Sequence, residues 1–464
     1  MGLTITPLES GARIPALDAI RGVALLGILL ANVRQMFLPW DVGAFAVPGR
    51  GGSDLAAWLD WGFFDALVDL KFITLFSLLF GAGFALQSER MAEHGTAFQG
   101  IYLRRLAILG LLGLAHGLLL YPAEVLLPYA IAGLLLYAAR GLSTDNLYRI
   151  GVVLVGSTIA WGFQLGALGR VSVPITLATV AALAATAAWL WGKNWRAALA
   201  VMALILFLSM IALLLRWDPQ DWGESIAVEY ARAKQQLAAI RASDPSTWPH
   251  EFAARQQAGP GALLRLHAEQ YSLMLAFFGV ILLWRTLGLF MIGAALVRSG
   301  VIRKATYATW RRVSLIGLGI GLPLSLIATV LQAQEIHGLS DWRWPEWLHV
   351  ASAFPLAIGF GARVIMNEKD GRRRWWYVRM ESAGRMALSN YVGQSVVMAT
   401  LAEPWGFGLY GQLGGQTLTT LAVVVFFALA SLSHAWLAHY RMGPLEWLWR
   451  CGTYARWLPN RITS

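Results

Sequence analysis

Residues 105–121 read RLAILGLLGLAHGLLLY, a leucine-rich run of membrane-spanning length that His116 interrupts. An apolar run of this kind predicts a transmembrane helix. A histidine at membrane depth is costly to desolvate, so it is a candidate functional residue unless a neighbouring helix satisfies it. Glu124, the next acidic residue along the chain, is close enough in sequence to orient or charge the imidazole.

The composition of the whole chain points the same way. Hydrophobic residues make up 57% of the 464 and charged residues 14%, with a mean hydropathy of +0.55. These values indicate a polytopic membrane protein. Cys451 is the only cysteine, which excludes an intramolecular disulfide. The net charge of +11 lies in short loops between apolar runs, so we expect it to set topology and expect no nucleic-acid partner.

The apolar runs predict an all-α, polytopic helical membrane protein with about twelve transmembrane helices. The expected helices lie near Leu17–Leu38, Val68–Gln87, Arg105–Tyr121, Val125–Ala139, Leu147–Leu168, Val173–Trp191, Ala197–Leu215, Leu273–Val297, Val313–Leu331, Leu348–Ile365, Met386–Leu401 and Thr419–His439. Arginine and lysine gather in alternate loops, which places the N- and C-termini in the cytoplasm. We therefore expect a multi-pass protein of the bacterial inner membrane, with an uncleaved first helix.

Four segments follow from this topology. Residues 1–216 form an N-terminal transmembrane bundle, and residues 217–270, which are polar and mixed in charge, form a periplasmic insertion. Residues 271–440 form a C-terminal transmembrane bundle. Residues 441–464 form a cytoplasmic tail whose tryptophan-rich start predicts an amphipathic helix on the membrane surface.

Polar residues near the periplasmic side are the first candidate group. Counting along the helices places Asn32, His116, Glu124 and His349 at one depth. Each also has a purely structural interpretation. For His116 and Asn32 it is a hydrogen bond to a neighbouring helix, for Glu124 solvation, and for His349 a position at the membrane interface.

The remaining candidates are basic or amide side chains. Asp18 and Arg21 are three residues apart and form either an ion pair or part of a cytosolic anion site. Arg285 falls at mid-membrane if Leu273–Val297 is one helix, or at the edge of a separate piece if it is not. Asn390 and Gln394 share a helix face, where hydrogen bonding between helices is the default interpretation. No nucleotide loop and no metal-ligand motif is present, so we expect no metal.

Several motifs resemble the YeiB-like membrane proteins. They are LDAIRG at 17–22 followed by Asn32, LFSLLFGAGF at 75–84 after Lys71-Phe72, the His116 segment, residues 290–300, ALSNYVGQS at 387–395, and GPLEWLWR at 443–450 followed by Thr453-Tyr454. The chain departs from the family pattern after the histidine, where Ala123-Glu124 stands in place of Gly-Asp. The carboxylate is retained but is one methylene longer.

This resemblance implies a helical core similar to the transmembrane acyltransferases, including the heparan-alpha-glucosaminide N-acetyltransferase and acyltransferase-3 groups. Such an enzyme takes an acyl group, here expected to be acetyl, from cytosolic acyl-CoA (acetyl-CoA) and passes it to a periplasmic acceptor. The resemblance also makes a homodimer an expectation. Residue by residue it implies a catalytic set of His116, Glu124 and Asn32, a co-substrate set of Arg21, Asp18, Arg285 and Arg385, and a substrate-binding set of His349, Asn390 and Gln394.

Two other functions remain open from the residues. One is a transporter for an anionic small solute, in which Arg285 binds the substrate and His116 with Glu124 relays protons. The other is a non-catalytic partner in envelope assembly, in which these polar groups only specify helix packing.

Overall fold

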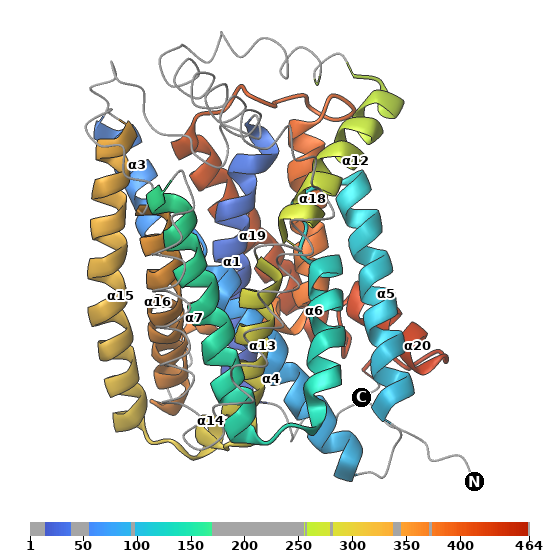
Figure 1. Cartoon of the computed structure of the whole chain (residues 1–464). Helices are drawn as coiled ribbons and strands as arrows, with labels where there is room; N and C mark the ends of the chain where they lie inside the picture. Colours follow the sequence, from blue (N-terminus) through green and yellow to red (C-terminus); the bar gives the residue numbers. More distant parts are fainter. Residues whose placement is uncertain are drawn as a thin grey trace, which may run out of the picture.

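The structure is a computed structural model that describes residues 14–38, 55–93, 98–168, 255, 258–278, 282–336, 345–370 and 374–462. Within these residues the chain is helical, apart from a single antiparallel bridge between Tyr440 and Arg461 (Figure 1). The predicted all-α fold is confirmed for them. The predicted helices Val173–Trp191 and Ala197–Leu215, and most of the predicted insertion, lie outside the described residues.

The helices lie close to the predicted apolar runs, but their first and last residues differ from the ends of those runs. Their bounds are α1 (Pro15–Phe37), α3 (Leu55–Phe63), the π-helical turn η2 (Phe64–Val68), α4 (Lys71–Glu93), α5 (Phe98–Leu119), α6 (Leu126–Ala138), the 3₁₀ turn η3 (Ala139–Gly141), α7 (Thr144–Leu168), α12 (Pro260–Phe277), α13 (Leu283–Arg298), α14 (Val301–Lys304), α15 (Tyr307–Ile336), α16 (Pro345–Lys369), α17 (Trp375–Arg385), α18 (Ala387–Ala402), α19 (Gly415–His439) and α20 (Pro444–Tyr454).

Five of the described helices are long and apolar enough to cross a bilayer. The qualifying segments are Pro15–Phe37, Gln99–Leu119, Tyr307–Ala333, Leu348–Lys369 and Gly415–His439. Leucine and isoleucine side chains of α15 are exposed along much of its length, as expected of a helix that contacts lipid. The chain is therefore a helical membrane protein.

Helix α1 lies in the middle of the bundle and packs against α4, α16, α17, α18 and α19 (Figure 1). Helices α15 and α16 form the most extensive helix pair, and α13 packs on α4, α6 and α7. We call the end of the bundle near α14 and α20 the α20 end, and the opposite end, near α3 and α12, the α3 end (Figure 1).

Small residues allow α4 and α13 to approach closely. A Cβ atom on Gly81 would lie 1.9 Å from the Phe290 carbonyl oxygen, and one on Gly293 would lie 2.0 Å from the Leu78 carbonyl oxygen. Glycine on facing helices is the usual device for such an approach in membranes. This contact fixes Arg285, in the first turn of α13, against the start of α4.

The single span expected over Leu273–Val297 includes residues 279–281, which lie outside the described residues; α12 precedes them and α13 follows them. The tail helix is confirmed as α20, which packs against α5 at the α20 end and also contacts α18. Its Glu446 accepts hydrogen bonds from the backbone N–H groups of Leu388 and Ser389, and so ties α20 to the first turn of α18.

Candidate functional site

His116 is buried near the last turn of α5, and neither of its ring nitrogens has a hydrogen-bond partner among the described residues. Its ring centroid lies 5.0 Å from that of Tyr391 on α18 and 6.4 Å from that of Tyr121. Buried polar groups in native proteins are almost always hydrogen-bonded, so an exception needs an explanation. Its unpartnered nitrogens make His116 a candidate to contact a bound molecule.

Glu124 does not contact the His116 ring nitrogens, in contrast to the expected pairing. Its carboxylate caps α6 by accepting hydrogen bonds from the N–H groups of Leu126 and, at 3.1 Å, Leu127. It also accepts a hydrogen bond of 2.7 Å from the Tyr271 hydroxyl on α12. Burial raises the pKa of Glu124, although these three donors partly oppose that rise. The Glu124 carboxylate caps α6 because the glutamate side chain is long enough to fold back onto the backbone N–H groups of the following residues.

The two predicted amides of α18 have different surroundings. The Asn390 side chain donates to the Ala383 and Met386 carbonyl oxygens and, at 2.8 Å, to the Ser433 hydroxyl on α19. Its role is therefore packing between helices. Gln394 is equally buried, but its Nε2 has no hydrogen-bond partner among the described residues. Because residues three apart share a helix face, Gln394 lies on the same face as Tyr391.

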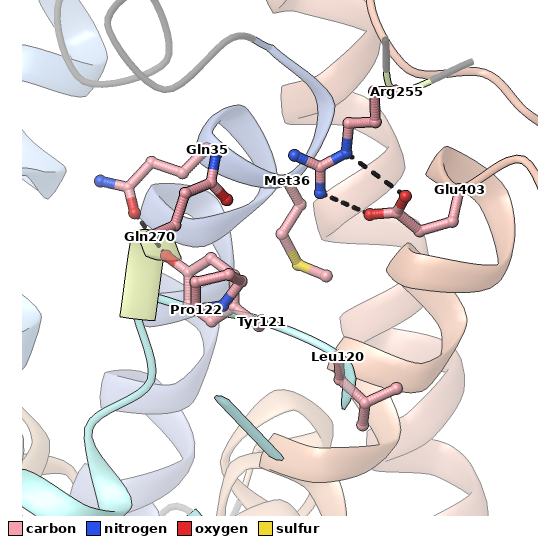
Figure 2. A pocket seen from close by; sticks show the side chains of 8 residues that line it. All are labelled: Gln35, Met36, Leu120, Tyr121, Pro122, Arg255, Gln270 and Glu403. Carbon is pink, nitrogen blue, oxygen red and sulfur yellow. Dashed lines mark hydrogen bonds and ion pairs between the residues drawn. The ribbon is translucent and has the colours of Figure 1, made fainter. Parts of the chain in front are cut away.

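A small pocket of about 10 Å³, enough room for about one water molecule, lies at the α3 end of the bundle (Figure 2). It is lined by Gln35, Met36, Leu120, Tyr121, Pro122, Arg255, Gln270 and Glu403. Tyr121 connects the pocket to His116, because its ring lines the pocket and packs edge-on toward the imidazole. The Tyr121 hydroxyl donates to the Gln35 side chain of α1 (Figure 2). Asn32, one turn earlier on α1, is half-buried.

Arg255 and Glu403 form the charged side of this pocket. Arg255 Nη2 lies 2.5 Å from Glu403 Oε1, and its Nε donates to Oε2 at 3.3 Å (Figure 2). His267 Nε2 is 3.6 Å from the same carboxylate. Burial alone would raise the pKa of Glu403, but the hydrogen bonds from His267 and Arg255, together with the charge of Arg255, hold it below its ordinary value.

A second buried polar group surrounds His349 on α16. Nε2 of His349 lies 2.7 Å from Asp65 Oδ2 on η2. Nδ1 lies 3.2 Å from Nζ of Lys71, which also donates to the Asp65 carbonyl oxygen at 2.8 Å. Because an ammonium can only donate, Nδ1 is the acceptor and the proton of a neutral His349 sits on Nε2. Nε2 is within ion-pair distance of Asp65 but is not aligned for a hydrogen bond to it. Thr329 completes the group by donating to Asp65 at 2.6 Å.

The backbone beside this group is irregular. Helix α3 ends in the π-helical turn η2, and α4 starts only after Leu70, whose φ is +59°. A left-handed non-glycine residue and a π-helical turn are uncommon conformations that concentrate at functional sites. Arg285 approaches the same break, where it donates to the Thr74 hydroxyl. Asp69 lies within electrostatic range of Lys71, His349 and Arg285.

The structure thus divides the predicted site residues into three places. His349 and Arg285 join the group at the helix break, and His116 lies with Tyr391. Asp18 and Arg21 form the expected ion pair on α1. Thirteen residues of α13 separate Arg285 from Arg298, the last residue of that helix, which lies at the α20 end of the bundle. At 1.5 Å per residue the separation is about 20 Å. Arg285 therefore does not belong to the same co-substrate site as Arg21.

Arg385, the last predicted residue, is half-buried at the end of α17. Among the residues that the structure describes, no three His, Cys, Asp or Glu side chains are arranged as metal ligands. Sequence reasoning missed Asp65, Asp69 and Thr329 as site residues, and it used Lys71 only as part of a family motif. The available signal was the presence of Asp69 and Lys71 within an expected span.

Comparisons with known proteins agree with the motifs. A model of the family described as "Protein of unknown function (DUF418)" matches residues 296–456. "Uncharacterized protein YeiB" of Escherichia coli (strain K12) is 28% identical over 445 residues, which are 94% of each chain. "Uncharacterized protein YxaH" of Bacillus subtilis (strain 168) is 26% identical over 467 residues, which are 98% of each. The predicted resemblance to the YeiB-like family is confirmed. No solved structure matches the chain.

The YeiB-like family model covers only part of the candidate site. It begins at the end of α13 and reaches α20, so it includes His349, Tyr391 and Gln394 but not His116. The full-length similarity to YeiB and YxaH extends to the N-terminal helices as well. The names of these relatives state no reaction, so the function must be argued from the site.

Proposed function

We propose that this YeiB-like protein is a transmembrane acyltransferase that moves an acyl group, most simply acetyl, from cytosolic acyl-CoA to a periplasmic acceptor. In this proposal the chain crosses the bacterial inner membrane about twelve times, with both termini in the cytoplasm. The α20 end then faces the cytoplasm, and the pocket at the α3 end opens to the periplasm. A homodimer is part of the same proposal by analogy with the transmembrane acyltransferases.

The environment of His116 carries this proposal. A neutral imidazole with both nitrogens unpartnered is ready to take a proton from a hydroxyl or amine. The acceptor's oxygen or nitrogen would form a bond to the acyl carbon, the carbon–sulfur bond would break, and the proton would pass through His116 to the coenzyme A thiolate. If His116 instead carries the acyl group, the same atoms are exchanged in two steps.

The neighbouring residues take supporting roles in the proposal. Asn32 would donate to the developing oxyanion, and Gln394 would hold the acceptor through its unpartnered amide. Glu124 would not contact the reacting atoms; its role would be to hold Tyr271 and the start of α6 in place. The pocket beside Tyr121 is the route by which the acceptor reaches His116. Asp18, Arg21 and Arg385 would serve the cytosolic entrance.

The test is transfer of label from [¹⁴C]acetyl-CoA in inverted membrane vesicles, which expose the cytoplasmic side and contain the native acceptor. We expect His116→Ala to reduce incorporation by about 10²-fold or more, as for loss of a general base. His439→Ala, an exposed histidine at the end of α19, is the matched control and should keep wild-type incorporation. Equal incorporation by wild type and His116→Ala in a folded protein would contradict the proposal.

A second candidate function is supported by the group at the helix break. Asp65, Lys71, His349 and Arg285 are buried, and Asp69 is half-buried, beside an interrupted helix of a membrane protein. Transporters use such an arrangement for ion coupling. The proton relay of such a transporter would be Asp65–His349–Lys71, and not His116 with Glu124. Uptake of an anionic solute by proteoliposomes without coenzyme A, abolished by His349→Gln, would favour this function.

A further inference from the structure

Arg105 has two other arginines, each from a separate element, within electrostatic range at the α20 end of the bundle. They are Arg21 of α1 and Arg450 of α20, and Arg105 itself belongs to α5. The Arg105 guanidinium is half-buried, so its charge is screened less by water than that of a fully exposed side chain.

Contacts between α20 and α5 hold this arrangement. The Arg105 guanidinium lies over the Trp449 ring, with Cζ 3.9 Å from the ring centroid. In return the Trp449 indole N–H donates to the Arg105 carbonyl oxygen at 2.9 Å. Arg104 donates to the Thr453 carbonyl oxygen at 3.1 Å, near the end of α20. These bonds keep Arg450, one residue after Trp449, close to the first turns of α5.

Carboxylates do not compensate the charge of Arg105. Among the described residues, Arg105 forms no ion pair with an acidic side chain, and Asp18 is engaged by Arg21. Glu446, the acidic residue of α20, accepts hydrogen bonds from the backbone of α18 and from the Ser389 hydroxyl. Neighbouring cations repel one another, so a fold that gathers them gains free energy when an anion binds among them.

We propose that Arg21, Arg105 and Arg450 form a phosphate-binding site of which α20 is one wall. Guanidinium groups bind phosphoryl oxygens in pairs, and their planar fork suits this ligand better than a lysine ammonium does. If the phosphate belongs to coenzyme A, the inference rests on the proposed function and assigns its phosphate end to this site. If the phosphate belongs to an anionic phospholipid, the recognition chemistry is the same, and the inference does not depend on the proposed acyltransferase function.

Calorimetry on the full-length protein in phosphatidylcholine nanodiscs tests the first source. The probe is adenosine 3′,5′-bisphosphate, which has phosphates of coenzyme A without its thiol. We expect Arg105→Gln and Arg450→Gln each to weaken binding about tenfold or more, the effect of losing charge-assisted hydrogen bonds. Arg105→Lys, which keeps the charge without the fork, should weaken it less. Arg303→Gln, an exposed cation of α14, is the control for net charge and should bind as wild type.

Native mass spectrometry after exchange into nanodiscs with phosphatidylglycerol tests the second source. Phosphatidylglycerol retained by the wild type and lost from Arg105→Gln would identify a lipid headgroup as the ligand. The proposal is overturned if neither ligand distinguishes wild type from Arg105→Gln. It is also overturned if Arg104→Gln, which removes only the Thr453 contact, weakens binding as much as Arg105→Gln does. Label transfer that depends on His116 but shows no effect of Arg105→Gln would overturn this site and leave the proposed function standing.

Discussion

Two histidines are buried to the same degree in this membrane protein and have opposite surroundings. His349 is 2% exposed, its Nδ1 has Lys71 and Ser325 as hydrogen-bond partners, and its Nε2 lies within ion-pair distance of Asp65 without a hydrogen bond. His116 is 4% exposed, and neither of its nitrogens has a partner of any kind among the described residues. A partnered group contributes to the stability of the fold. An unpartnered group costs stability, and a ligand that satisfies it recovers this cost.

The comparison therefore separates two kinds of effect. Substitutions around His349 should act first on stability, because several helices meet at its side chain. Substitutions of His116 should act on function and leave stability unchanged or improved.

Lys71→Met should produce the largest loss of stability. It removes the buried cation that lies within electrostatic range of Asp65 and Asp69, and leaving a buried charge uncompensated in this way costs about 3–5 kcal/mol. Chemical unfolding in detergent micelles measures the change. Lys369→Met, at the exposed end of α16, is the matched control. If Lys71→Met is as stable as the control, the polar group around His349 does not stabilise the fold, and the proposed difference between His349 and His116 is wrong.

Gly81→Val should have the next largest effect. The added side chain would meet the Phe290 backbone, and overpacking of this kind costs about 1–3 kcal/mol. The resulting separation of α4 from α13 should also weaken the contact between Arg285 and Thr74. Gly156→Ala provides the control, since a Cβ there meets no atom within 4 Å. Thermal unfolding of the two variants side by side checks the difference, and equal melting temperatures would contradict it.

Asn390→Ala should cost about 1–2 kcal/mol, because it removes the hydrogen bond to Ser433 and leaves two carbonyl oxygens with fewer donors. Gln394→Leu, one turn along the same helix, removes an unpartnered amide and should cost less. Unfolding measurements on both variants sharpen the comparison within α18. A larger loss for Gln394→Leu would show that its amide is satisfied in the protein.

The pH dependence of stability should differ between two buried carboxyls. The pKa of Glu403 lies below its ordinary value of 4.5, so its contribution is fully present above pH 4.5 and is lost as pH falls through the folded-state pKa. Burial raises the pKa of Glu446, whose hydrogen bonds only partly offset this, so protonation near and above pH 4.5 favours the folded state. At pH 7, Glu403→Gln should therefore melt below wild type and Glu446→Gln at or above it, and both differences should shrink as pH falls to 4 and below.

The sequence was sufficient to predict the long helices because their apolar runs are local. Pro15–Phe37 and Gly415–His439 agree closely with the expected spans, and α20 lies where the tryptophan-rich tail predicted it. The π-helical turn and the left-handed Leu70 were not predictable, since contacts with α13, α15 and α16 stabilise them and no local pattern encodes them. Helix α6, in contrast, was predicted over Val125–Ala139 and is found at Leu126–Ala138.

The candidate site was only partly predictable for the same reason. Counting along helices gives depth, and the structure buries His116, His349 and Arg285, three of the polar residues that this count singled out. Depth does not show which residues meet: Lys71 and His349 are 278 positions apart in sequence. Glu124 shows that residues close in sequence need not interact. It was expected to pair with His116, but its carboxylate accepts hydrogen bonds from the backbone of α6 instead.

Replacing His116 with Phe tests the central claim most directly, because Phe fills the same apolar space without ring nitrogens. Unfolding in detergent and label transfer from [¹⁴C]acetyl-CoA should be measured on the same preparation. We expect His116→Phe to have a melting temperature equal to or above that of the wild type and to lose transfer of the labelled acetyl group. A marked fall in melting temperature, or transfer at the wild-type rate, would contradict it.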